Sequence, residues 1–348
     1  MSSADGSAVI KVVGIGGGGT NAINRMIECG LGGVSFIAMN TDLQVLANSV
    51  AEDKLQLGDS LTKGLGVGGD PEMGRNAAEE SKQEIKKSLE GSDMVFVTAG
   101  MGGGTGTGAA PVVSDIAREQ GALTIAIVTK PFSFEGPRRA RAAEEGIEAL
   151  REKVDTIIVI PNDRLLDVTE KKSTLLEAFR FADDILRQGV QGISDIITIP
   201  GYINVDFADV KAIMSDAGSA LMGIGQATGE HRAVEAAQAA IASPLLETTI
   251  DGARGVLFNI TGGSDLTLSE VYEAADVVFK ATDEREANII FGTVIDDKFE
   301  GGVQVTVLAT GFDSGSRPIG PERVLVRERV PVRAATDDLD IPAFLRRR

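Results

Sequence analysis

Short apolar runs alternate with amphipathic stretches through the first half of the chain. The runs end in glycine or polar residues, as buried strands do where they lead into loops. They lie within residues 8–16, 34–42, 93–108, 122–131 and 154–163. Between them, helical spacing predicts helices around Ala22–Ile27, from Pro71 to Leu89 and from Ala109 to Glu119. This alternation indicates a parallel, doubly wound α/β sheet whose ligand loops follow the carboxyl ends of the strands.

A long helix is predicted next, over residues 174–199. Thr174 and Glu177 have the spacing of a capping box, in which both side chains bond the backbone where a helix begins. Apolar residues follow at roughly helical intervals, at Leu175, Phe179, Leu186, Val190 and Ile193. We expect this helix to connect two domains, 9–173 and 200–313.

The second domain has an α/β pattern of its own. Strands are predicted at 255–263, 288–296 and 303–312, and helices at 232–242 and 269–281. Both halves therefore have enough apolar residues to form a core.

The two ends of the chain differ from the domains. Residues 1–8 are polar and predict a disordered tail, and 314–336 combine three prolines with little periodicity, which is typical of a flexible linker. The linker contains Arg317, Arg323, Arg327, Arg329 and Arg333. Apolar residues recur in the final dozen residues of the chain, DDLDIPAFLRRR, which resemble a short binding peptide.

Composition excludes several classes of function. A formal net charge of -17 and the absence of tryptophan argue against a nucleic-acid partner. A single cysteine, Cys29, excludes an internal disulfide and a multi-cysteine metal site. A single histidine, His231, leaves almost no material for histidine-based metal ligation or a Ser-His-Asp triad. No apolar run approaches the roughly 18 residues that a membrane span needs, so we expect a cytoplasmic protein without direct membrane insertion.

A first glycine loop lies between a strand and a helix, at Gly14–Asn21. It satisfies the GxGxxG spacing, which suits either a tight turn or a phosphate held on backbone amides at a helix N-terminus. Asp42, at the end of the next strand, could serve as the ribose-binding acid of a nicotinamide-dependent oxidoreductase. The first loop alone leaves these alternatives open.

A second glycine loop, GGGTGTG at 102–108, again joins a strand to a helix. Two such loops imply a polyphosphate gripped from both sides. No GxxxxGK[ST] motif is present, so no P-loop lysine meets the phosphate charge. Backbone amides, hydroxyls and Mg²⁺ are expected to do so instead.

The GGGTGTG loop is similar to the signature loop shared by tubulin and FtsZ. The resemblance to bacterial FtsZ runs from about residue 9 to 313 and resumes in the final dozen residues. It implies a tubulin/FtsZ-like α/β fold, with an N-terminal doubly wound parallel-sheet GTP-binding domain, a long connecting helix and a C-terminal α/β domain. It also implies a filament-forming GTPase of bacterial cell division.

The same resemblance assigns the residues that bind GTP. The phosphates are expected to contact Gly17, Gly18, Gly19, Thr20, Asn21, Gly68, Gly69, Gly104, Thr105 and Gly106. Glu135 is expected near the ribose and Arg139 near the phosphates, because a carboxylate accepts from hydroxyls and a guanidinium binds phosphate oxygens.

For the guanine base, the resemblance implies Asn162, Phe179 and Asp183. A carboxylate can accept from the N1–H and the amino group of guanine together, which would select GTP. Asp184 is the alternative acceptor, and spacing alone also permits Phe179 to be an ordinary core residue.

A last motif opens a helix at the start of the second domain, with Asn204, Asp206 and Asp209. From the residues alone, Asp206 could be a simple N-cap and Asp209 could favour the helix dipole. The resemblance makes all three catalytic, acting on the GTP of the next subunit in a head-to-tail homopolymer. Mg²⁺ and a monovalent cation are the expected ions.

The resemblance also extends to partners and location. The peptide Asp337–Arg348 is expected to bind membrane-tethering and regulatory division proteins, at a midcell division ring. Two alternatives from other classes are a non-hydrolysing, nucleotide-dependent filament scaffold and an NAD(P)-binding oxidoreductase. The presence of both Asp206 and Asp209 argues against the scaffold, and the second glycine loop argues against the oxidoreductase.

Overall fold

The computed structural model describes residues 8–168, 174–199, 203, 205–246, 250, 252–282 and 287–312. These residues belong to one compact unit. The predicted N-terminal tail, except for Ala8, lies outside them, as do the predicted linker and binding peptide.

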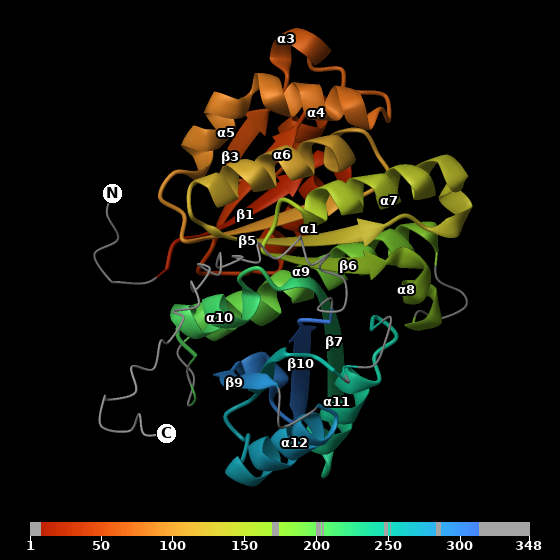
Figure 1. The fold of residues 1–348 in the computed structure, drawn as a ribbon. Coiled ribbons are helices and arrows are strands. Elements are labelled where there is room, and N and C mark those ends of the chain that lie inside the picture. Colours follow the sequence, from red (N-terminus) through yellow and green to blue (C-terminus); the bar gives the residue numbers. More distant parts are fainter. Residues whose placement is uncertain are drawn as a thin grey trace, which may run out of the picture. The chain divides into compact units, whose positions relative to one another are not determined.

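One sheet runs through both halves of the described chain, in the order β3-β2-β1-β4-β5-β6-β7-β10-β8-β9 (Figure 1). Its strands are β1 (Ile10–Ile15), β2 (Ser35–Asn40), β3 (Asp53–Gln56), β4 (Met94–Gly100), β5 (Leu123–Lys130), β6 (Thr156–Pro161), β7 (Gly218–Thr228), β8 (Gly255–Gly262), β9 (Asn288–Ile295) and β10 (Gly302–Thr310). The strands from β3 to β7 pair in parallel, which confirms the predicted parallel sheet of the first half. The second half is mixed, because β10 pairs antiparallel with both β7 and β8.

Helices cover both faces of the first half of the sheet. Alternate residues along β1 point to opposite faces, so Val13 and Ile15 pack on one side and Ile10 and Val12 on the other. One face is covered by α4 (Pro71–Glu80), α5 (Lys82–Leu89), α6 (Thr105–Glu119) and α7 (Pro137–Arg151). The other is covered by α1 (Gly16–Glu28), α2 (Leu43–Asn48), α8 (Asn162–Val168) and α9 (Leu175–Thr198). A short α3 (Asp59–Thr62) lies between β3 and α4.

The helices predicted from Pro71 and from Ala109 have different bounds in the structure. The predicted helix from Pro71 to Leu89 is interrupted at Ser81, a buried residue whose hydroxyl accepts a hydrogen bond from the Gly58 amide at 2.9 Å. The helix predicted from Ala109 begins four residues earlier, at Thr105, within the glycine loop. Glycine is required there for packing, because a Cβ at Gly108 would lie 1.9 Å from the Pro71 carbonyl oxygen of α4.

The connecting helix α9 has the predicted start. The Thr174 amide donates to Glu177 Oε2 at 2.6 Å, and the Glu177 amide donates to Thr174 Oγ1 at 3.3 Å, so the capping box is confirmed. Buried residues Leu186, Val190 and Ile193 join α9 to the core that it shares with both halves of the sheet.

The second half adds α10 (Phe207–Met214), α11 (Arg232–Ile241) and α12 (Leu268–Lys280). Strand β7 was not predicted, because its sequence GSALMGIGQAT has little alternation. Its glycines permit close packing: a Cβ at Gly223 would lie 2.1 Å from the Ala240 carbonyl oxygen of α11.

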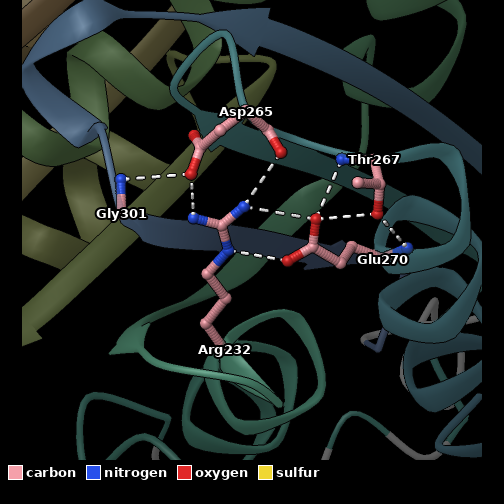
Figure 2. A network of polar contacts seen from close by, with 5 residues as sticks. All are labelled: Arg232, Asp265, Thr267, Glu270 and Gly301. Atoms are coloured by element: carbon pink, nitrogen blue, oxygen red, sulfur yellow. Dashed lines mark hydrogen bonds and ion pairs between the residues drawn. The ribbon is translucent and has the colours of Figure 1, made fainter.

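A buried arginine joins α11 to the start of α12 (Figure 2). Arg232 donates to Asp265 Oδ2 and to Glu270 Oε1, both at 2.6 Å. Glu270 in turn closes a capping box with Thr267, and Asp265 accepts from the Gly301 amide at 3.3 Å. One guanidinium therefore fixes three segments of the second half.

Candidate nucleotide site

A cavity of about 610 Å³ lies at the carboxyl ends of the parallel strands. This edge of a doubly wound sheet is where such folds bind ligands. The residues predicted for GTP that line it are Gly17, Gly18, Asn21, Gly68, Gly69, Gly104, Thr105, Gly106, Glu135, Arg139, Asn162, Phe179 and Asp183. Segments far apart in the sequence thus meet around one space.

Two of the predicted phosphate residues, Gly19 and Thr20, do not line the cavity. Gly19 is buried against β4, where a Cβ would lie 2.3 Å from the Thr98 carbonyl oxygen. The Thr20 hydroxyl donates to the Gly16 carbonyl oxygen at 2.7 Å inside α1. Gly19 and Thr20 are therefore buried in the protein and do not face the cavity.

One end of the cavity is formed by two helix N-termini. Neither α1 nor α6 has a side chain that caps its first turn, so the backbone amides there remain available to an anion. The loops touch: Gly16 has a φ of 70°, and a Cβ on it would lie 2.8 Å from the Gly106 nitrogen. The positive ends of two helix dipoles therefore lie at the same end of the cavity, where they would favour a polyphosphate.

Several lining residues were not individually assigned to GTP from the sequence. They are Asn40, Thr41, Val45, Leu65, Gly66, Val67, Gly100, Met101, Gly103, Thr129, Pro131, Ala182 and Leu186. Asp42, considered only as the ribose-binding acid of an oxidoreductase, lines the cavity as well. Thr41 lies 2.7 Å from Thr105, hydroxyl to hydroxyl, and so reaches the second glycine loop. Its position at the carboxyl end of the predicted strand, 34–42, was the available signal. Asp42 is the N-cap of α2, and its Oδ1 accepts a hydrogen bond from the Gln44 amide at 2.8 Å. One of the two carboxylate oxygens of Asp42 is therefore already engaged.

Glu135 and Arg139 form an ion pair at the side of the cavity. Glu135 is largely buried and also accepts from the Phe132 amide at 3.0 Å, whereas the Arg139 side chain is 58% exposed. The pair can therefore present a fixed carboxylate to ribose hydroxyls and a movable guanidinium to phosphate oxygens.

Polar and aromatic side chains line the far end of the cavity. Asn162 is buried, and its Oδ1 has no hydrogen-bond partner among the described residues. Phe179 is 37% exposed and contacts Phe132 edge to face, with ring centroids 5.4 Å apart. Phe179 is therefore not an ordinary core residue, and its ring could stack on a base.

Of the two neighbouring aspartates on α9, Asp183 lines this cavity. Asp184 instead accepts from Arg187 at 2.7 Å and from Gln188 at 2.6 Å. Burial raises the pKa of Asp183 to about 7, against the opposing effect of the nearby Arg25 charge. A base with paired donors would provide the hydrogen bonds that this carboxylate lacks.

The predicted catalytic acids lie away from the cavity. Asp206 is the N-cap of α10 and accepts from the Asp209 amide at 2.8 Å, and both side chains are exposed. Neither lines the cavity, and Asn204 lies outside the described residues. Within the described ranges, no three His, Cys, Asp or Glu side chains group as a metal site would.

Comparison with known proteins agrees with this geometry. Residues 9–170 match the Tubulin/FtsZ family, GTPase domain, and residues 218–313 match the FtsZ family, C-terminal domain. The structure is similar to an empty FtsZ dimer from M. jannaschii, with 47% identity and a TM-score of 0.85 over 88% of this chain and 89% of that chain.

More distant structures share the fold. A GTPγS-bound protofilament of CetZ2 from Haloferax volcanii has 21% identity and a TM-score of 0.71, over 86% of this chain and 92% of that chain. A GDP-bound monomer of CetZ1 from the same organism has 20% identity and a TM-score of 0.74, over 87% and 94%. The first half of the chain is thus a GTPase domain, and the chain belongs to the FtsZ family of tubulin-like proteins.

Proposed function

We propose that this protein polymerises head to tail with GTP and hydrolyses each GTP at the junction with the next subunit. One observation carries the proposal: the cavity holds the amides and base-recognition groups, while the exposed acids Asp206 and Asp209 lie outside it. A second copy would bring these acids to the phosphate end. The dimer of the M. jannaschii relative is consistent with such self-association.

In this mechanism the neighbour's Asn204, Asp206 and Asp209 orient and polarise a water for in-line attack on the γ-phosphate. Positioning and electrostatics are the main contributions of a protein to phosphoryl transfer. Because the nucleotide face of one subunit meets a different face of the next, the contact is heterologous and generates open filaments.

Mg²⁺ fits this site as an ion held by phosphate oxygens and water. The lining offers hydroxyls such as Thr41 and Thr105 but few carboxylates, and Mg²⁺ commonly uses one or two protein ligands beside substrate phosphates. When bound, it would neutralise charge that develops on the phosphates, and a monovalent cation could assist.

The cellular role follows from the family and remains a proposal. We infer that the filaments organise a division ring at midcell in the cytoplasm, and that Asp337–Arg348 binds membrane-tethering and regulatory division proteins. Among the helices that the structure describes, none is long and apolar enough to cross a membrane.

Concentration dependence tests the proposal. Phosphate release per subunit should be negligible in dilute protein and rise once GTP, but not GDP, makes the protein sediment, because each active site needs two subunits. A rate per subunit that is independent of concentration would contradict it. Polymer without phosphate release would instead indicate the non-hydrolysing scaffold, and NADH consumption the oxidoreductase.

A further inference from the structure

The helix that carries the proposed catalytic acids is held at its opposite end. The last carbonyls of a helix have no partners within the helix. At the end of α10, the Thr156 hydroxyl from β6 donates to the Met214 carbonyl oxygen at 2.6 Å. The Thr310 hydroxyl from β10 lies 3.5 Å from the Ile213 carbonyl oxygen. Both threonines are buried, so α10 is fixed to both halves of the sheet.

The turn after α10 is fixed by charge. Asp155 is buried and accepts from the Thr124 amide at 2.9 Å. Its other oxygen lies 3.5 Å from the Asp216 amide and 3.6 Å from Arg118 Nε. Arg118, from α6, also pairs with the Asp216 carboxylate. Asp216 has a φ of 51°, a left-handed conformation that aspartate tolerates better than most residues.

We name Arg118, Asp155, Thr156 and Asp216 the α10 anchor. It lies at the amino ends of β5 and β6, whereas Thr129 and Asn162, which line the cavity, lie at their carboxyl ends. At about 3.3 Å per residue, the six steps from Thr156 to Asn162 span roughly 20 Å. The anchor is therefore remote from the GTP that its own subunit binds.

We propose that the α10 anchor positions Asp209 for hydrolysis of the GTP on the next subunit. The inference rests on the proposed function, because it assigns these four residues a role at the neighbour's site. Since α10 is a helix of only eight residues, a shift at Met214 is transmitted to its first turn. A misplacement of about 1 Å can cost around a hundredfold in rate. The anchor residues are positioning residues, since none of them touches the nucleotide.

Substitutions that loosen the anchor should separate catalysis from binding. Arg118→Ala removes both ion pairs, and Asp216→Asn removes one while retaining a residue that tolerates positive φ. Each should lower kcat roughly tenfold or more, with KM and GTP affinity changed by less than about twofold. Arg118→Lys should recover part of the rate. Arg151→Ala, which breaks an exposed ion pair with Glu148 on α7, is the matched control and should leave kcat unchanged.

A mixing experiment shows on which subunit the defect acts. Arg118→Ala, which keeps an intact cavity, is mixed with Gly106→Ser, which keeps an intact α10. Phosphate release should exceed the sum of the separate variants, because the Arg118→Ala cavity can meet a correctly held Asp209. Asp209→Ala mixed with Gly106→Ser serves as the reference, and thermal melts confirm folding.

The outcomes separate two failures. Recovery in the reference mixture without recovery for Arg118→Ala would overturn the anchor role and leave hydrolysis across the junction standing. A fall in GTP affinity that matches the fall in kcat would also overturn it. No recovery in the reference mixture would overturn hydrolysis across the junction and the anchor role together.

Discussion

Asp183 and Asp184 follow each other on α9 but face different partners. The carboxylate of Asp183 borders the nucleotide cavity, and no residue that the structure describes donates a hydrogen bond to it. Burial raises the pKa of Asp184, but hydrogen bonds from Arg187 and Gln188 and the charges of Arg187 and Arg25 outweigh burial and hold the pKa below its usual value. Successive residues of a helix point about 100° apart, so only one of them can face the base.

Asp183→Asn should weaken GTP binding, because an amide offers guanine one acceptor and one unwanted donor in place of two acceptors. The loss of a charge-assisted hydrogen bond is worth roughly 1.5 to 3 kcal/mol, or about ten- to a hundredfold in affinity. Xanthosine triphosphate, which has a carbonyl where guanine has the amino group, should bind this variant better than it binds the native protein. Calorimetric titration measures both affinities. Asp184→Asn is the control, and an equal loss of GTP affinity in both variants would refute the assignment.

GTP affinity should depend on pH through Asp183. Its pKa is about 7 in the nucleotide-free protein, whereas the carboxylate must be ionised to accept both guanine donors. Below pH 7, binding therefore releases a proton, and affinity should fall by up to about tenfold per pH unit. Titration in buffers of different ionisation enthalpy detects that proton. Because the nucleotide phosphates also titrate, the relevant quantity is the ratio of the native and Asp183→Asn affinities for GTP. This ratio should rise with pH up to about pH 8 and be constant and largest above it.

The same carboxylate should reduce the stability of the nucleotide-free protein. Burial raises the pKa of Asp183 from its ordinary value of 3.8 to about 7, so between these pH values the folded state binds more protons than the unfolded state. The free energy of unfolding therefore decreases as pH rises through 7. Asp183→Asn should therefore melt at a higher temperature than the native protein at pH 8, with the advantage shrinking toward pH 4. If the difference in melting temperature between Asp183→Asn and the native protein instead grew as pH fell, the prediction would be contradicted.

The Arg232 network of the second half should be sensitive to loss of its single cation (Figure 2). Arg232→Ala leaves Asp265 and Glu270 without their main partner. It should lower the free energy of unfolding mainly through Glu270, because the Glu270 side chain is 17% exposed whereas that of Asp265 is 41% exposed. Urea unfolding measures the cost. Combining Arg232→Ala with Glu270→Gln should recover part of it, because one uncompensated charge is removed; a purely additive double variant would argue against a coupled network.

The network also predicts acid sensitivity. Hydrogen bonds from Arg232 hold the pKa of Glu270 at about 2, below its ordinary value of 4.5. The stability that this interaction contributes is present above pH 4.5 and is lost as pH falls toward 2. Between pH 4.5 and 2, the free energy of unfolding of Glu270→Gln should therefore fall less than that of the native protein. An unchanged acid profile would show that other carboxylates dominate.

Alternation of strands and helices predicted most of the fold because each element had a clear period. The capping box at Thr174 fixed the start of α9 from two residues alone. Strand β7 was missed because its glycines, which make room for α11, also remove the alternation by which a strand is recognised. The early start of α6 was missed because glycines usually disfavour a helix, whereas here close packing requires Gly108.

The phosphate end of the site was predictable from two glycine loops, each with a physical reason to bind an anion. The base end came from the family resemblance, since nothing in the spacing distinguishes Asp183 from Asp184. Lining residues such as Val45, Leu65 and Leu186 could not be predicted, because an apolar side chain at a cavity has the same sequence signature as one in the core.

Hydrolysis across the subunit junction is most directly tested by mixing two inactive variants. Asp209→Ala retains a complete GTP cavity but lacks the acid it offers to its neighbour. Gly106→Ser retains the acids but should lose GTP, because a Cβ at Gly106 would lie 2.7 Å from the Gly100 carbonyl oxygen. In a mixed filament, the cavity of an Asp209→Ala subunit meets the intact Asp209 of a Gly106→Ser subunit. Phosphate release from the folded, co-sedimenting mixture should exceed the sum of the two separate rates; a strictly additive rate would contradict catalysis between subunits.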